Sequence, residues 1–244
     1  PFQLLKECIS GLFDDIDIVC YLRRQDEYLR SAYAQGLRSG RTAESFDDYL
    51  QSATDGNRRW LYEYDASLAH WAESFGAEHL IVRPFEREQL HTDGLVADFA
   101  QTCALDTRRL KTRVREKNVS PGKRVMAGLA YAQTLLPDIS GTGSEAAWLS
   151  TMCSNMSDAL AARWTDEPFT GFGPGQARQF NELFAQGNRV VARDYLGRED
   201  GRLFLSSTYR EQEAQPAIIL SKKDRRDVER RVARIMKMLA KIKG

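Results

Sequence analysis

Two residue types that can grip a phosphate, arginine and serine, follow a short apolar run near the start of the chain. Residues 16–22 are apolar apart from Asp17 and rich in β-branched side chains, which predicts a buried strand, and residues 26–37 have helical spacing. Arg23 stands at the end of the predicted strand and Ser31 within the predicted helix. An arginine offers a planar fork of donors and a serine a neutral donor. We expect both to reach one phosphomonoester.

The turn between these two elements adds to the expected anion site. Asp26 is the predicted N-cap of the helix, with Glu27 in its first turn. The free backbone amides of a helix N-terminus and an arginine would then meet at the carboxyl end of a strand, where open α/β sheets bind anionic ligands. Strand-turn-helix units with an arginine at the turn are also common without any ligand. For Arg24, the sequence leaves open whether it assists Arg23 or faces solvent.

The order Arg23, Ser31, Tyr33 and Gln35 after an apolar strand resembles the 3′-phosphate-binding segment of sulfotransferases that use 3′-phosphoadenosine 5′-phosphosulfate (PAPS), in their bacterial and carbohydrate-directed branch. This resemblance implies an α/β fold of the P-loop-NTPase-like kind: three layers, α/β/α, with a central parallel sheet and a helix-rich C-terminal half. It implies transfer of a sulfuryl group from PAPS to a hydroxyl or amine of a small-molecule or oligosaccharide acceptor. The predicted donor contacts are Arg23, Arg24, Ser31, Asn118 and Ser120.

Looser matches to the same family occur further along the chain. Residues 108–124 hold eight basic residues and one acidic residue, and the Asn118-Val119-Ser120 run within them resembles a loop of bacterial sulfotransferases. A solvated basic loop is the alternative interpretation of this run. The remaining matches are Phe75, Gly76, Leu80, Val82, Glu86, Leu90, Phe99, Phe180, Asn188, Arg193, Asp194, Tyr195 and Leu196.

The catalytic residues are not identified by the sequence. In the family that this chain resembles, the loop that cradles the 5′-phosphosulfate follows the first strand, and the catalytic base comes soon afterwards. No copy of that loop is found in these 244 residues. We therefore expect both to precede Pro1 and the chain to be a fragment. The alternative is a non-catalytic, degenerate sulfotransferase-like module that binds or assembles through its C-terminal helix. A nucleotide-sugar transferase is disfavoured because no acidic pair of metal-binding type is present.

Composition limits the remaining function classes. The net charge of +1 argues against a surface that binds polyanions everywhere. The four cysteines are widely spaced and only three histidines are present, so we expect reduced thiols, no metal site and a cytoplasmic protein. No run of eighteen apolar residues and no signal-peptide pattern occurs, which predicts a soluble chain.

The C-terminal residues 222–243 carry ten basic and three acidic residues. Their apolar positions predict a helical seam, which suits either a coiled coil or a helix docked on a larger body, its own domain or a partner. We expect a domain at residues 1–205 and a linker with this basic helix at residues 206–244. Docking outweighs nucleic-acid or membrane binding, and a homo-oligomer through the helix is an open possibility. The seam residues are Val228, Val232, Ile235, Leu239 and Ile242.

Two further helices and one strand are predicted around these features. Residues 59–75 predict a long helix with Trp60 in its buried stripe, and residues 79–86 predict a second buried strand. A helix followed by glycine and a strand is half of a βαβ unit, which predicts a parallel sheet. Residues 176–196 predict a helix interrupted at Gly187.

Overall fold

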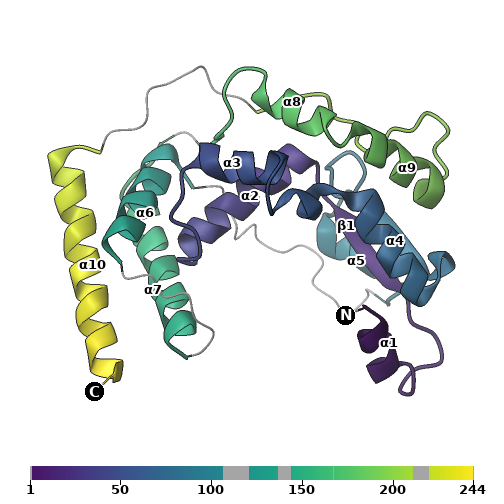
Figure 1. The fold of residues 1–244 in the computed structure, drawn as a ribbon, viewed down its shortest axis with the longest axis horizontal. Helices are drawn as coiled ribbons and strands as arrows, with labels where there is room; N and C mark the ends of the chain where they lie inside the picture. Colours follow the sequence, from purple (N-terminus) through teal and green to yellow (C-terminus); the bar gives the residue numbers. More distant parts are fainter. Residues whose placement is uncertain (1, 107–120, 137–143, 167, 211–219, 244) are drawn as a thin grey trace. The chain divides into compact units, whose positions relative to one another are not determined.

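The computed structural model describes residues 2–106, 121–136, 144–166, 168–210 and 220–243. The protein is a mixed α/β chain rich in helix (Figure 1). It divides into two compact units, each built from three separate stretches of sequence. Unit 1 comprises Pro1–Tyr28, Ser52–Lys117 and Arg178–Tyr209, and unit 2 comprises Leu29–Gln51, Asn118–Ala177 and Arg210–Gly244.

Unit 1 contains a small parallel sheet. Strand β1 (Ile18–Leu22) pairs with β2 (Leu80–Pro84) in parallel, with Ile18 opposite Leu80 and Leu22 opposite Pro84. Both strands and their parallel pairing confirm the sequence prediction, although β1 begins two residues later than expected. Among the described residues the sheet has these two strands, so what is seen is a parallel α/β pair rather than a broad central sheet.

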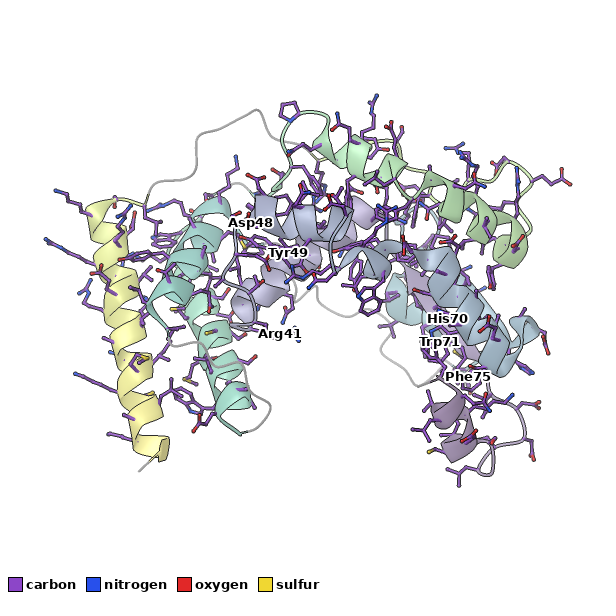
Figure 2. The ribbon with its side chains drawn as sticks, viewed as in Figure 1. Arg41, Asp48, Tyr49, His70, Trp71 and Phe75 are labelled. Atoms are coloured by element: carbon purple, nitrogen blue, oxygen red, sulfur yellow. The ribbon has the colours of Figure 1, made fainter. Side chains whose placement is uncertain are left out.

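Helices cover this sheet and form the core of unit 1. The core combines α4 (Tyr64–Phe75), α9 (Ala185–Leu196) and the two strands, with Leu68, Val82 and Val191 buried at its centre. Helix α1 packs on α4, where the Phe2 ring lies 4.5 Å from that of Trp71, one turn before Phe75 (Figure 2). The other elements of this unit are η1 (Arg59–Tyr62), η2 (Ala77–His79), α5 (Leu95–Thr102), α1 (Phe2–Ile9) and most of α8 (Gln176–Glu182).

Two predicted helices differ from the observed ones. The helix expected at residues 59–75 is split at Glu63, whose φ of −86° and ψ of 78° are not helical. The split turns Trp60 outward, where it is 64% exposed, so its predicted burial was wrong. The late helix breaks between α8 and α9 and not at Gly187, which lies inside α9. A Cβ at Gly187 would stand 2.5 Å from the Asp65 carboxylate, so glycine lets α9 approach α4 closely.

Unit 2 is helical. It contains α6 (Lys123–Leu135), α7 (Ser144–Ala161) and α10 (Lys222–Lys243), and it shares α2 (Gln25–Arg38) and α3 (Phe46–Thr54) with the stretches assigned to unit 1. Edge-to-face aromatic contacts join α2 to α3 within this unit. The rings involved are those of Tyr33, Phe46, Tyr49, Phe169 and Phe172, all within 5.9 Å of a neighbour.

Helix α10 has the bounds that the sequence predicted, and it packs on α6 and α7. Ser221 begins it as an N-cap, because its hydroxyl accepts the backbone amide of Asp224 at 3.1 Å. The seam residues Val228, Val232, Ile235 and Leu239 are buried, as expected for a docked helix. The side chain of Ile242 lies outside the described residues. Across the described ranges, no helix combines the length and the apolar character needed to cross a membrane.

Candidate anion site at the strand ends of unit 1

The predicted turn between strand and helix is present, and its details differ in one respect. Strand β1 ends at Leu22, and α2 begins at Gln25. Asp26 therefore lies inside the first turn and is not the N-cap that the sequence predicted. Its backbone amide donates to Asn181 Oδ1 at 3.2 Å. One of the amides expected to bind an anion is thus satisfied by a side chain of the same unit.

Arg24 is held inside the protein. It is 5% exposed, and its Nε and Nη2 donate to the two oxygens of Asp26 at 2.7 and 3.0 Å. Its Nη1 donates to the carbonyl of Ser206 at 3.1 Å, and Nη2 also donates to that of Thr208 at 2.8 Å. The guanidinium also stacks 4.7 Å from the ring centre of Tyr209.

The protonation of Arg24 is secure in this setting. Burial lowers the pKa of its guanidinium, but the hydrogen bonds and charge of Asp26 outweigh burial and leave the pKa above its ordinary value. Arg24 therefore does not face solvent, and four of its five N–H donors are engaged within the protein. Its geometry is that of a structural cation that holds the 206–209 segment to the start of α2.

Arg23 is placed differently. Its side chain is 34% exposed, its Nε donates to Glu27 at 3.3 Å, and its guanidinium lies 5.5 Å from the centre of the Phe85 ring. The hydroxyl of Tyr64 donates to the backbone carbonyl of Arg23 and fixes the turn. Burial raises the pKa of Tyr64, so this donor stays protonated. Of the two arginines, Arg23 is the one that can still meet an anion from solution.

A buried amide pair supports the first turn of α2. The Gln25 side chain is fully buried, and its Nε2 donates to Asn188 Oδ1 at 2.8 Å. Asn188 Nδ2 donates back to Gln25 Oε1 at 3.1 Å. The sequence matched Asn188 to the sulfotransferase family but did not find its partner. Neither Gln25 nor Asn181 has a local sequence signal, because each partner is more than 150 residues away.

Residues 203–209, the late segment that Arg24 contacts, also contact the carboxyl end of β2. Glu86 is 8% exposed and accepts the backbone amides of Leu205 at 2.6 Å and Ser206 at 3.2 Å. Gln89 Nε2 donates to the same carboxylate at 2.7 Å. The late segment 203–209 is thus fixed at both strand ends, by Glu86 on its amides and by Arg24 on its carbonyls.

A third charged cluster joins the strands to α5. Asp98, 1% exposed, accepts from Arg83 Nε at 3.0 Å and Nη2 at 2.5 Å, from the Tyr21 hydroxyl at 2.7 Å and from the amide of His91 at 2.9 Å. Arg83 and Tyr21 are register partners on β2 and β1. Burial raises the pKa of Asp98, but these hydrogen bonds outweigh it and hold the pKa below its ordinary value. Burial and the same contact raise the pKa of Tyr21 to about 12.

The other predicted donor contacts are Ser31, Asn118 and Ser120. Ser31 is exposed on α2, in the part of that helix that belongs to unit 2. Asn118 and Ser120 lie outside the described residues, as does most of the basic run at residues 108–124. Their roles stay predictions. Within the described ranges no group of three or more His, Cys, Asp or Glu side chains could hold a metal ion.

Comparison with known proteins gives one distant relative. The chain is 30% identical over 105 residues to an uncharacterized protein of Archaeoglobus fulgidus. The match covers 42% of this chain and 26% of that protein, so the chain matches about a quarter of its relative's length. No protein-family model and no solved structure matches the chain.

Proposed function

We propose that this chain is part of a PAPS-dependent sulfotransferase that transfers a sulfuryl group to a hydroxyl or amine of a carbohydrate-like acceptor. The observation that carries the proposal is the position of Arg23: it follows β1 directly, precedes α2 and keeps one third of its side chain exposed. The proposal includes the three-layer α/β/α fold, with β1 and β2 as two strands of its central parallel sheet.

Arg23 would bind the 3′-phosphate of the donor nucleotide. A guanidinium pairs with two phosphate oxygens through parallel hydrogen bonds, and this grip orients the donor for displacement at sulfur. In that reaction the bond from sulfur to the bridging phosphate oxygen breaks as the acceptor oxygen or nitrogen attacks. Arg24, buried and with four of its five N–H donors engaged, supports the turn that presents Arg23. Ser31, Asn118 and Ser120 are proposed as further donor contacts from the family resemblance.

The direct test is a calorimetric titration of adenosine 3′,5′-bisphosphate, the product nucleotide, into the longest natural form of the polypeptide. We expect micromolar binding that Arg23→Ala weakens by about 1–3 kcal/mol, the scale of a lost charge-assisted hydrogen bond. Arg87→Ala is the matched control, because Arg87 is an exposed arginine after β2. It should leave the affinity within about twofold.

A second variant tests the role of Arg23 through an expected gain in affinity instead of a loss. Glu27 is the acid that pairs with Arg23, so Glu27→Gln removes a competitor for its guanidinium. The affinity for the bisphosphate should rise a few-fold, whereas Ser31→Ala should lower it. No heat and no shift in melting temperature with the unmodified protein would refute the sulfotransferase proposal. Equal losses for Arg23→Ala and Arg87→Ala would refute the assignment of Arg23.

A further inference from the structure

The outward face of α10 carries a concentrated stripe of cations. With about 100° of rotation per residue, seven basic residues fall within an arc of about 120°. The two other residues in this arc are Ala233 and Ala240, and no acidic residue lies in it. We call this set the outer arc; its cations are Lys222, Lys223, Arg226, Arg230, Arg234, Lys237 and Lys241.

The three acidic residues of α10 are bound elsewhere in unit 2. Asp224 pairs with Arg124 at 2.9 Å, Asp227 pairs with Arg163 at 3.0 Å, and Glu229 accepts the Tyr131 hydroxyl at 2.7 Å. These contacts draw the negative charge of α10 toward the helices on which it packs. Two of the three acids, Asp224 and Asp227, are buried against these helices, whereas Glu229 is exposed at the border of the outer arc.

Most cations of the outer arc are exposed and have no internal partner. Arg230 pairs with Asp227 at 3.5 Å while remaining largely exposed. In the described part of the chain the other six form no ion pair, and all six are exposed. The stripe runs for about 28 Å along the helix, at 1.5 Å per residue. Seven cations over that length make the surface of the outer arc strongly positive, although the net charge of the whole chain is only +1.

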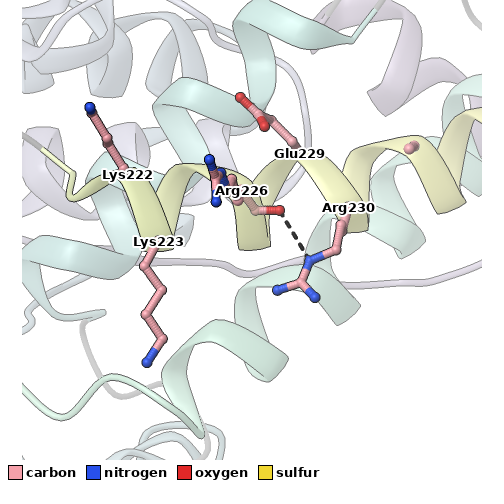
Figure 3. A pocket seen from close by; sticks show the side chains of 6 residues that line it. Lys222, Lys223, Arg226, Glu229 and Arg230 are labelled. Carbon is pink, nitrogen blue, oxygen red and sulfur yellow. Dashed lines mark hydrogen bonds between the residues drawn. The ribbon is translucent and has the colours of Figure 1, made fainter.

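The surface over the first half of the stripe is hollowed. A hollow of about 840 Å³ is lined by four cations, Lys222, Lys223, Arg226 and Arg230, together with Glu229 and Ala233 (Figure 3). The small side chain of Ala233 leaves room between the longer ones. The hollow thus lies beside four cations, of which Lys222, Lys223 and Arg226 form no ion pair within the described residues.

We propose that the outer arc of α10 binds an anionic polysaccharide, a linear chain bearing sulfate or carboxylate groups. The composition of the arc favours this occupant over other polyanions. It has no aromatic ring on which bases of a single strand could stack, and no Asn or Gln to read adenine in a duplex. The arc itself has no large apolar side chain for insertion into a lipid surface; the exposed Met236 and Met238 lie on either side of it, and the apolar seam is already packed on α6 and α7. This inference does not depend on the proposed sulfuryl transfer.

Binding to immobilised heparin, measured over a series of salt concentrations, tests the proposal. The double variant Arg226→Gln and Arg234→Gln removes two cations of the outer arc. The control Arg87→Gln and Arg193→Gln removes two exposed arginines of unit 1, so both variants have the same net charge. At about 50 mM salt we expect roughly tenfold weaker binding for the first variant and a change within about twofold for the control. The dependence on salt should also become shallower for the first variant alone.

The charge-conserving variant Arg226→Lys and Arg234→Lys guards against effects on folding. It should keep heparin binding within about threefold, because the interaction depends on charge along the stripe. Equal weakening by the two glutamine variants, or loss of binding in the lysine variant, would overturn the proposal. Tighter binding to duplex DNA, to a single-stranded oligonucleotide or to phosphatidylserine vesicles than to heparin would assign the arc to another polyanion and overturn it as well.

Discussion

The charged residues at the strand ends of unit 1 and those on the outer arc of α10 in unit 2 follow opposite rules. Arg24, Glu86 and Asp98 are buried, and each is surrounded by matched donors or acceptors. The cations of the outer arc are exposed, and six of the seven form no ion pair in the described part of the chain. The first group holds elements together, whereas the second leaves its charge available to a ligand.

The physical reason for the difference is the cost of desolvation. A buried charge persists only if neighbouring groups replace its water, so its donors or acceptors are consumed inside the protein. An exposed lysine or arginine keeps its water and needs no partner. Arg23 stands between these cases, with one carboxylate partner and partial exposure. Removing buried charges should therefore affect stability, and removing exposed ones should affect binding alone.

The largest stability loss is expected for Asp98→Asn. The amide keeps the size of the carboxylate but loses its charge and places an NH₂ group opposite donors, leaving Arg83 without its partner. We expect a loss of about 3 kcal/mol in the free energy of unfolding, measured by urea denaturation. Glu88→Gln, at an exposed acid, should change it by less than about 0.5 kcal/mol. A comparable loss in both variants would contradict the role given to the cluster.

The pH dependence of stability should reveal the contribution of the Asp98 carboxylate. The pKa of Asp98 is lower in the folded protein than in the unfolded chain, so its contribution is present above the unfolded value of about 4 and is lost as the pH falls through the folded value. Melting temperatures of the unmodified protein and of Asp98→Asn should differ at pH 7 and converge below about pH 4. A difference that stays constant down to pH 2 would exclude this linkage.

A smaller loss is expected for Glu86→Gln, about 2 kcal/mol, because the two backbone amides bond to different oxygens of Glu86 and a glutamine keeps only one acceptor oxygen. The change should be local as well. Hydrogen exchange at the amides of Leu205 and Ser206 should accelerate, while exchange within α10 is unchanged. Unaltered protection of these two amides would show that Glu86 does not hold the late segment.

The smallest effect on stability is expected on the outer arc. Arg226→Gln combined with Arg234→Gln should change the free energy of unfolding by less than about 0.5 kcal/mol, because these side chains are exposed and have no ion pair within the described residues. Chemical denaturation of this variant beside Asp98→Asn measures the contrast directly. Similar losses in the two variants would remove the distinction between the two regions.

Local patterns predicted much of the fold. The strand-turn-helix at β1 and α2, the parallel partner β2 and the bounds of α10 all follow from short-range periodicity. The predictions failed where a single residue interrupts a good pattern. The non-helical backbone at Glu63 splits the helix expected at residues 59–75, and it exposes Trp60 although its spacing suits burial. A hydrophobic period gives no warning of such a break.

The sequence by itself determined which residues could bind an anion: Arg23 and Arg24 at a strand end, and a row of cations opposite an apolar seam on α10. Only the tertiary structure decided which of them are available. Arg24 donates hydrogen bonds to the carbonyls of Ser206 and Thr208, and a backbone amide in the first turn of α2 donates to Asn181. These partners lie more than 150 residues away, and no local pattern encodes them. Hydrogen bonds between distant segments form only when the chain folds. The tertiary structure therefore decides which donors are already bonded and which can still bind a ligand.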